Sequence, residues 1–262
     1  LALGLDPQKS TIFLQSDIPE HVELSWLLSN VTPVGLLERG HSYKDKIAKG
    51  FSPNAGLMTY PILMASDILI YDTDVVPVGK DQKQHLEMTR DIAMKFNQQY
   101  GVDLFKLPEP LILDSVAVIP GTDGQKMSKS YGNTINMFAP KNVLEKQVMS
   151  IVTDSAELEA PKNPDNSISQ LYKLFVSEEK YQEMRAKFMA GGYGYGHAKK
   201  ELLEAILEYF KDARARREEL EKNPEYIEEV LRKGALKARE IARKKITEAK
   251  QIVGLMGNVY NK

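Results

Sequence analysis

The spacing of apolar residues predicts a mixture of helices and strands over the first 140 residues. Apolar residues recur at helical intervals over residues 19–31, which predicts an amphipathic helix. Its apolar stripe is predicted to contain Val22, Trp26, Leu27 and Val31. Residues 54–71 are apolar on nearly every side, which indicates a helix buried inside the protein. Residues 11–16, TIFLQS, are short, β-branched and apolar, and they favour a strand.

A short apolar strand, a glycine and a long helix follow one another in the next segment. Residues 72–79, DTDVVPVG, predict the strand, and a helix is predicted from about Asp81 to Gly101. SVAVIPG, residues 115–121, predicts a further buried strand. A strand, a glycine and a helix in this order form the βα unit of a parallel sheet. The first part of the chain is therefore predicted to be α/β.

Strand patterns cease after about residue 140. Helices are predicted over residues 141–152, 168–189, 197–220 and 224–253. The glycine-rich stretch GGYGYGH, residues 191–197, follows a helix and not a strand, so it predicts a hinge between helices instead of a nucleotide-binding loop. We therefore predict two domains, residues 1–138 and residues 139–262, of which the second is all-α.

The composition is that of an ordinary globular protein. The chain has 262 residues, 42% of them hydrophobic and 27% charged, which is enough for one large domain or two smaller ones. It has no cysteine, which excludes disulfides and thiolate metal sites, and its four histidines lack ligand spacing, so no metal site is predicted. No apolar run is long enough to span a membrane and no signal-peptide pattern is present, so a cytoplasmic location is expected.

A basic stretch stands out against a formal net charge of −1. Residues 232–250 contain eight Lys or Arg and two Glu, a local net charge of +6. A helix with such a face could lie on a phosphate backbone. The alternative interpretation is a solvated charged helix with no partner.

Three residues of the predicted buried helix suggest a ligand pocket. Tyr60, Met64 and Asp67 are spaced i, i+4 and i+7, so they share one helix face. A carboxylate in so apolar a segment is costly unless it is paired or binds something. Asp67 therefore indicates a pocket that accepts an N–H or O–H donor. The alternative is an ion pair with Arg or Lys on a neighbouring element.

The end of the predicted strand at residues 72–79 is a second candidate site. Gly79 leaves room for a ligand to approach the backbone, and Asp81 and Gln82 stand where the strand gives way to a helix. Ligands of open α/β sheets bind at this edge, and an aspartate there can accept hydrogen bonds from a ribose diol. The alternative is an ordinary aspartate N-cap with a glycine turn.

A third candidate is the polar segment TDGQKMSKSYGNTI, residues 122–135. Lys126 and Lys129 are three residues apart, with Gly124 and Gly132 on either side. Such a cationic loop could close on a polyphosphate and neutralise the charge of a leaving group. It is not a Walker loop, because the order of glycines and lysine is wrong. The alternative is a solvated lysine turn.

Three motifs together resemble the bacterial tryptophanyl-tRNA synthetases, a family of class I aminoacyl-tRNA synthetases. They are KMSKS at 126–130, PVGKDQKQH at 77–85 and TYPILMASDILIY at 59–71. The resemblance extends over nearly the whole chain. It implies a Rossmann-type parallel sheet followed by an all-α, anticodon-binding domain. It also implies a homodimer that activates L-tryptophan with ATP and Mg²⁺ and transfers it to tRNA(Trp).

The resemblance also implies roles for individual residues. Asp67 would accept the indole N–H, Met64 would line the indole ring, and Tyr60 with Gln82 would lie near the substrate amino group. The residues implied to meet the ribose and adenine of ATP are Gly79, Lys80 and Asp81. The residues implied to close on the pyrophosphate are Lys126, Met127, Ser128, Lys129 and Ser130, with the two lysines as the catalytic cations.

One family signature is missing from this sequence. Such enzymes begin with a Rossmann strand and a His-Ile-Gly-His-like segment, and neither occurs in the 262 residues. We therefore expect a sheet that is incomplete at its N-terminal end. Two alternative functions follow: a catalytically incomplete fragment that binds tryptophan or tRNA, and a tyrosyl-tRNA synthetase relative, since a phenol O–H is also a hydrogen-bond donor.

Overall fold

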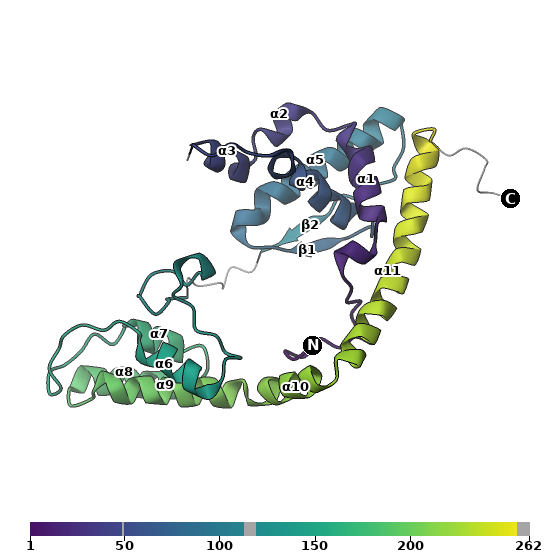
Figure 1. Ribbon diagram of the computed structural model, residues 1–262. Coiled ribbons are helices and arrows are strands. Elements are labelled where there is room, and N and C mark those ends of the chain that lie inside the picture. The colour runs from purple at the N-terminus through teal and green to yellow at the C-terminus, as the bar shows by residue number, and fades with distance from the viewer. Residues whose placement is uncertain (49, 113–118, 256–262) are drawn as a thin grey trace. The chain divides into compact units, whose positions relative to one another are not determined.

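The computed structural model describes residues 1–48, 50–112 and 119–255 (Figure 1). These residues fall into two compact units. The sheet unit consists of Asp6–Asp114 and Pro224–Lys262, and the helical unit consists of Leu1–Leu5 and Ser115–Asn223. This division is based on contacts within the structure, whereas the predicted domains, 1–138 and 139–262, are functional. The functional domains stay a prediction.

The sheet unit contains a parallel sheet surrounded by helices. Its elements are η1 (Gln15–Asp17), α1 (Glu20–Ser29), α2 (Val34–Leu37), α3 (His41–Ala48), α4 (Ala55–Leu69), β1 (Val75–Pro77), η2 (Lys80–Gln82), α5 (Lys83–Tyr100), β2 (Glu109–Leu111) and α11 (Pro224–Ile252). The two described strands pair in parallel, with Val75 opposite Glu109 and Pro77 opposite Leu111. The α/β prediction is confirmed for this part of the chain.

Local sequence signals set the ends of the two central helices. The Asn54 side chain accepts a hydrogen bond from the Leu57 amide at 2.8 Å, which caps α4 at its N-terminus. Gly101 ends α5 as predicted, in the left-handed conformation that glycine adopts without strain (φ 64°). Helix α5 begins at Lys83, two residues later than predicted, because the preceding residues form the short helix η2.

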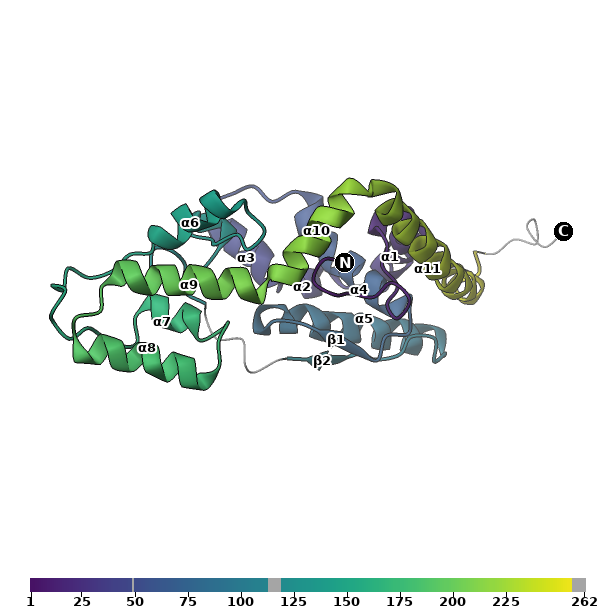
Figure 2. The ribbon, with the colours of Figure 1, turned by 90° about the horizontal axis from the view of Figure 1, so that it is seen from below.

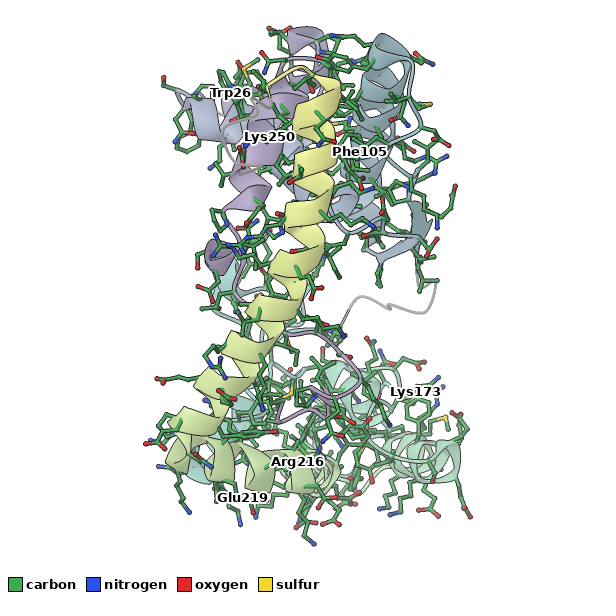
Figure 3. The ribbon with its side chains drawn as sticks, turned by 90° about the vertical axis from the view of Figure 1, so that its right-hand side faces the viewer. Trp26, Phe105, Lys173, Arg216, Glu219 and Lys250 are labelled. Atoms are coloured by element: carbon green, nitrogen blue, oxygen red, sulfur yellow. The ribbon has the colours of Figure 1, made fainter. Side chains whose placement is uncertain are left out.

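The core of the sheet unit lies between α1, α4, α5 and α11. Figure 1 shows α11 running beside α1, and the two helices are in contact. Phe105 is fully buried in this core beside α11 (Figure 3). The fully buried side chains from the four helices include Leu24, Leu28, Ile62, Leu69, Ile92, Phe96, Ala242 and Ala249. The residues of α11 therefore complete a core that begins 200 residues earlier in the chain.

The predicted strand over residues 11–16 is wrong. Residues 11–14 have no regular structure and Gln15 and Ser16 belong to η1. Helix α11 packs directly onto this segment: a Cβ atom at Gly234 would lie only 1.9 Å from the carbonyl oxygen of Ile12. The segment's backbone therefore lies against a helix, and in the described part of the chain no strand pairs with it.

The predicted stripe of the first helix is wrong in part. Val22 and Trp26 are 66% and 69% exposed, whereas Leu24, Leu27 and Leu28 are buried. The period was right and the helix forms at Glu20–Ser29, but the buried face is rotated relative to the predicted one.

The strands near the end of the sheet unit differ from the predicted ones. The strand β2 was not predicted from the sequence. The strand predicted over residues 115–121 falls mainly on residues 113–118, which lie outside the described ranges.

The helical unit contains the predicted C-terminal helices other than the last. Its elements are η3 (Lys129–Tyr131), α6 (Lys141–Met149), α7 (Ser167–Tyr172), α8 (Glu178–Ala190), α9 (Tyr195–Tyr209) and α10 (Lys211–Lys222). Helix α9 packs between α6 and α7 (Figure 2). The predicted hinge at GGYGYGH is confirmed, since Gly191 and Gly192 have positive φ angles of 81° and 74° between α8 and α9.

Two predicted long helices are each divided in the structure. Ser177 separates α7 from α8, because its side chain accepts a hydrogen bond from the Lys180 amide and so begins a new helix. The other predicted helix is interrupted at Phe210, between α9 and α10. Among the described residues, no helix combines the length and the apolar character needed to cross a bilayer. The cytoplasmic location stays a prediction.

Candidate active site

The face of α4 that carries Tyr60, Met64 and Asp67 is its open face. All three residues are partly exposed. The residues of α4 that are buried are Pro61, Ile62, Ala65, Ser66, Ile68 and Leu69. The prediction of a helix buried on all sides is therefore wrong on this face, and the shared face predicted from the spacing is accessible to a ligand.

The Asp67 carboxylate is held by an amide and an imidazole. The Gln15 Nε2 atom donates hydrogen bonds to both carboxylate oxygens, at 2.9 and 2.7 Å. The His21 Nδ1 atom lies 3.4 Å from Oδ1. Within the described residues no Lys or Arg pairs with Asp67, so the alternative of a structural ion pair with Arg or Lys is not supported.

Burial affects the charge of all three groups in this cluster. Burial raises the pKa of Asp67, although the hydrogen bond from Gln15 and the proximity of His21 act in the opposite direction. Burial lowers the pKa of His21, whose Nε2 atom is 2.7 Å from the hydroxyl of Tyr71. Burial and the neighbouring carboxylates raise the pKa of Tyr71 to about 12. The neutral form of the His21 imidazole is therefore favoured beside the Asp67 carboxylate.

Tyr60 is tied to the next helix of the sheet unit. Its hydroxyl hydrogen-bonds to Nε2 of the buried His85 on α5, and the two rings are 5.3 Å apart between centroids. Gln82 is partly buried and occupies the N-cap position of the same helix. The packing of α4 against α5 thus brings Tyr60 close to the start of α5, where Gln82 lies.

The strand-end site has the predicted connection. Gly79 follows β1 and precedes η2, and its carbonyl accepts a hydrogen bond from the Gln82 amide at 2.9 Å. The φ angle of Gly79 is −70°, so the backbone conformation does not require a glycine there. Lys80 is exposed. The side chain of Asp81 lies outside what the structure describes.

The KMSKS loop, residues 126–130, presents two exposed lysines. Within the described residues neither Lys126 nor Lys129 forms an ion pair. Ser128 begins the short helix η3: its Oγ atom accepts from the Ser130 amide at 3.3 Å and lies 2.7 Å from the Ser130 hydroxyl. Met127 is partly buried against the core of the helical unit. The loop therefore anchors itself through Met127 and leaves its cations in solvent.

The residue that holds this loop was not identified from the sequence. Asn133 is 3% exposed, and its Oδ1 accepts from the Ser128 amide at 2.7 Å. Its Nδ2 donates to Asp123 Oδ1 at 2.7 Å and to the Lys126 carbonyl at 3.1 Å. The first of these bonds lowers the pKa of Asp123. One amide side chain thus binds the loop backbone at residues 126 and 128 and the side chain of Asp123.

The candidate residues are divided between the two compact units. Asp67, Tyr60 and Gly79 belong to the sheet unit, and the KMSKS loop belongs to the helical unit. Each group has the local geometry described above. The prediction that both groups line one crevice stays a prediction.

A parallel βα unit and a KMSKS loop are the attributes of a class I aminoacyl-tRNA synthetase, and comparison with known proteins agrees. The sequence profile of the family described as tRNA synthetases class I (W and Y) matches residues 1–211. The tryptophan–tRNA ligase of Fusobacterium nucleatum is 73% identical over 260 residues, which cover 99% of this chain and 80% of that protein. The chain therefore belongs to the class I aminoacyl-tRNA synthetases, in the tryptophanyl branch.

Solved structures of the same branch have the same fold. The Campylobacter jejuni tryptophanyl-tRNA synthetase, described as complexed with ADP and tryptophan, superimposes with a TM-score of 0.91 at 52% identity. The match covers 97% of this chain and 80% of that one. The Mycoplasma pneumoniae tryptophanyl-tRNA synthetase gives a TM-score of 0.75 at 30% identity, over 98% of this chain and 80% of that one. The Rossmann-type fold implied by the sequence motifs is therefore confirmed.

Proposed function

We propose that this chain joins L-tryptophan to tRNA(Trp) in two steps. The amino-acid carboxylate attacks the α-phosphorus of ATP, which gives tryptophanyl-adenylate and pyrophosphate. A terminal ribose hydroxyl of the tRNA then attacks the activated carbonyl, which gives the ester and AMP. The observation that carries the proposal is the Asp67 carboxylate, which is partly exposed on α4 and bound to an amide instead of a cation.

Asp67 is suited to accept the indole N–H. A carboxylate oxygen has two lone pairs, and Gln15 uses one position on each oxygen, so acceptor capacity remains. Met64 lies one turn before Asp67 on the same open face, where it would line the indole ring. Tyr60 and Gln82 would lie near the substrate amino group, and the packing of α4 against α5 supports this placement.

The polyphosphate would be bound by backbone and cations. Gly79, Lys80 and Asp81 would meet the ribose and adenine of ATP at the end of β1, the edge where open α/β sheets bind nucleotides. Lys126, Met127, Ser128, Lys129 and Ser130 would close on the phosphates. The two lysines would offset the charge that develops on pyrophosphate as it leaves.

Mg²⁺ is expected to arrive with ATP, because the phosphates supply the oxygen ligands it prefers. Among the described residues, no group of three or more His, Asp or Glu could hold a metal ion. The contribution of the protein would be positioning and charge stabilisation by its own side chains.

The proposal is tested with the purified 262-residue chain. We expect pyrophosphate exchange that depends on tryptophan, charging of tRNA(Trp), and no effective competition by tyrosine. Exchange that runs equally well with tyrosine would indicate a tyrosyl relative. Tryptophan or tRNA binding without any turnover would indicate a catalytically incomplete fragment.

Most of the Lys and Arg side chains in the basic stretch of α11 form ion pairs within the sheet unit. Arg239 and Arg243 bind Glu20 Oε1 at 3.0 and 3.2 Å, and Lys250 binds Glu23 at 2.6 Å. The buried Lys245 binds Asp72 at 2.7 Å. Arg232 and Lys233 pair with Glu229. Of the eight Lys and Arg in residues 232–250, two have no ion pair within the described residues: Lys237 and Lys244.

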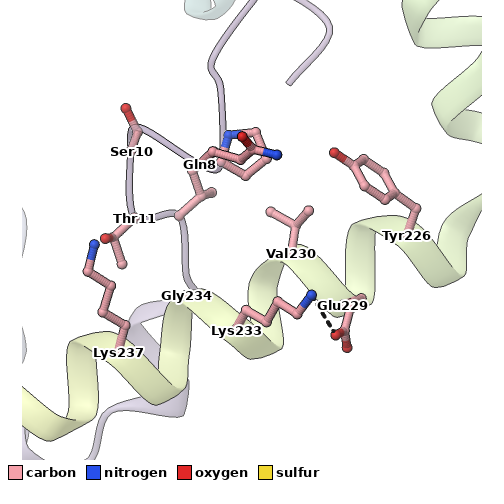
Figure 4. A pocket seen from close by; sticks show the side chains of 11 residues that line it. Gln8, Ser10, Thr11, Tyr226, Glu229, Val230, Lys233, Gly234 and Lys237 are labelled. Atoms are coloured by element: carbon pink, nitrogen blue, oxygen red, sulfur yellow. Dashed lines mark ion pairs between the residues drawn. The ribbon is translucent and has the colours of Figure 1, made fainter.

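We therefore propose that the RNA-binding surface of α11 consists of Lys237 and Lys244 and not of the whole basic stretch. Lys237 lines a pocket of about 310 Å³ between α11 and the N-terminal segment, with its side chain directed toward Thr11 and with Ser10 nearby (Figure 4). Lysine and hydroxyl side chains are ordinary partners of RNA phosphates. Lys244 follows Lys237 by seven residues and lies on the same side of the helix.

Replacing Lys237 and Lys244 together by alanine is expected to weaken tRNA binding and to flatten its dependence on salt. Two lost phosphate contacts should reduce the slope of log affinity against log salt by about 1.5. The measurement is a salt titration of tRNA binding. The matched control is Lys95→Ala on α5, which removes an exposed lysine that has no ion pair in the described chain. An unchanged slope in the double variant would rule out this RNA surface.

A homodimer is proposed from the exposed face of α1. Val22 and Trp26 are four residues apart, so they share a helix face, and Trp26 is 69% exposed (Figure 3). These two large apolar side chains would form part of the dimer interface. Trp26 is the single tryptophan of the chain. Its fluorescence emission is therefore expected to shift to shorter wavelength as the protein concentration rises and dimers form. If sedimentation shows that the chain dimerises but the emission does not change with concentration, the interface lies elsewhere.

A further inference from the structure

Three elements of the sheet unit bring polar side chains to Asp67. Gln15 comes from η1, His21 from α1, and Tyr71 from the turn after α4. Tyr71 is the last residue of the motif TYPILMASDILIY, but none of the three was predicted from the sequence to act on Asp67. We propose that Gln15 and His21 are positioning residues that keep the Asp67 carboxylate ionised and correctly oriented for the indole N–H of tryptophan. This proposal rests on the role of Asp67 in the proposed function.

The geometry of Gln15 fixes the plane of the carboxylate. A single nitrogen, Nε2, lies 2.9 Å from Oδ1 and 2.7 Å from Oδ2, so rotation of the carboxylate would break one of the two contacts. Hydrogen bonds to the ionised form of an acid favour that form. Gln15 itself is exposed, so it can be replaced without opening a cavity in the core.

His21 acts from the buried side of Asp67. The Tyr71 hydroxyl keeps its proton at all ordinary pH values, because its pKa is about 12, and it can donate that proton to Nε2 at 2.7 Å. In that tautomer the ring proton of the neutral imidazole is on Nδ1, which lies 3.4 Å from Oδ1. Nδ1 is buried and makes no hydrogen bond in the described chain. His21 therefore acts on the carboxylate through electrostatics, which lower the pKa of Asp67.

The other charged groups near this cluster belong to an internal network. Glu20, the residue before His21, is buried and bound to Arg239 and Arg243 of α11. Its charge acts on His21 and Tyr71. Burial acts to raise the pKa of Glu20, but the hydrogen bonds and charges of the two arginines lower it, so Glu20 favours its ionised form. Asp67 and His21 are then the titrating groups of this cluster, and Gln15 distinguishes between them because its side chain bonds to Asp67.

The sign of the pH effect follows from the acceptor role. Indole binding requires the carboxylate, so tryptophan affinity is present above the pKa of Asp67 and is lost as the pH falls through it. Burial raises the pKa of Asp67, and Gln15 and His21 limit that rise. A variant that lacks the Gln15 donor should therefore lose tryptophan affinity at a higher pH than the unmodified chain.

The test compares tryptophan affinity by calorimetry as a function of pH, down to the pH at which affinity is lost. Gln15→Glu keeps the shape of the side chain but replaces the amide donor by a second carboxylate. We expect the acid limb of the affinity profile to move upward by about one pH unit or more. Gln15→Ala removes the donor without adding charge and should give a smaller shift in the same direction. Gln99→Glu, the same substitution at an exposed position of α5, should leave the profile unchanged.

A parallel measurement on Asp67→Ala, which removes the acceptor altogether, separates this proposal from the one on which it rests. If Asp67→Ala binds tryptophan as well as the unmodified chain, Asp67 is not the indole acceptor and the pocket assignment is wrong. If Asp67→Ala loses affinity but both Gln15 variants keep the original pH profile, the positioning role of Gln15 is overturned. A shift of the acid limb in the two Gln15 variants, with none in Gln99→Glu, supports the positioning role.

Discussion

Replacing Lys129 by alanine is expected to slow tryptophan-dependent pyrophosphate exchange by at least ~10²-fold, the scale of one preorganised charge contact in a transition state. Tryptophan affinity should stay nearly unchanged, because the lysine would meet the phosphates and not the amino acid. The expected effect is large because Lys129 has no acid partner in the described chain, so its whole charge is available to the leaving pyrophosphate. The effect should therefore appear in kcat and not in the tryptophan KM.

The matched control for this prediction is Lys141→Ala. Lys141 is also exposed and without an ion pair among the described residues, at the start of α6 in the same unit. The Lys141→Ala substitution should leave the rate of pyrophosphate exchange unaltered. A Lys129→Ala enzyme that exchanges pyrophosphate at the original rate would remove the KMSKS loop from the chemical step. Lys126→Ala should resemble Lys129→Ala, since both lysines are exposed on the same loop.

Replacing Asp67 by alanine is the second large expected effect. The indole N–H would enter a partly buried pocket without its acceptor, and a hydrogen bond to a charged group contributes about 1.5–3 kcal/mol. Tryptophan affinity should therefore fall by about 10- to 150-fold, a range that follows from the factor of ten per 1.4 kcal/mol. Discrimination against analogues without the N–H should disappear as well, because the specific acceptor is gone.

Calorimetry with tryptophan and with an analogue that lacks the indole N–H measures both parts of this prediction. Asp103→Ala is the matched control, because Asp103 is exposed in the same unit and makes no ion pair in the described residues. Equal tryptophan affinity before and after the Asp67 substitution would contradict the pocket assignment. Loss of affinity without loss of discrimination would show that Asp67 shapes the pocket without contacting the indole nitrogen.

The features that the sequence predicts well are those decided by neighbours along the chain. The βα connection at Gly79, the end of α5 at Gly101 and the hinge at Gly191 each depend on glycine and on local periodicity. The shared face of Tyr60, Met64 and Asp67 follows from helix geometry alone. Its exposure to a ligand required knowledge of what packs on the other side of α4.

The features that the sequence did not predict depend on distant partners. Gln15 lies 52 residues before Asp67, and it falls in a segment whose composition favours a strand. That segment is not a strand because α11, more than 200 residues later, packs onto it at Gly234. Arg239 and Arg243 are likewise indistinguishable in the sequence from RNA-binding residues, and only their ion pairs with Glu20 reveal their structural role.

The assignment of α11 to the same compact unit as α1 has a consequence for folding during synthesis. Arg239 meets Glu20 across 219 residues, and the helical unit is inserted between these two partners. A ribosome releases the amino-terminal portion first, so Leu24 and Leu28 have no α11 to cover them until the last helix emerges. Contacts so distant in sequence also slow folding. The nascent chain therefore carries an open apolar surface on α1 until α11 has been synthesised.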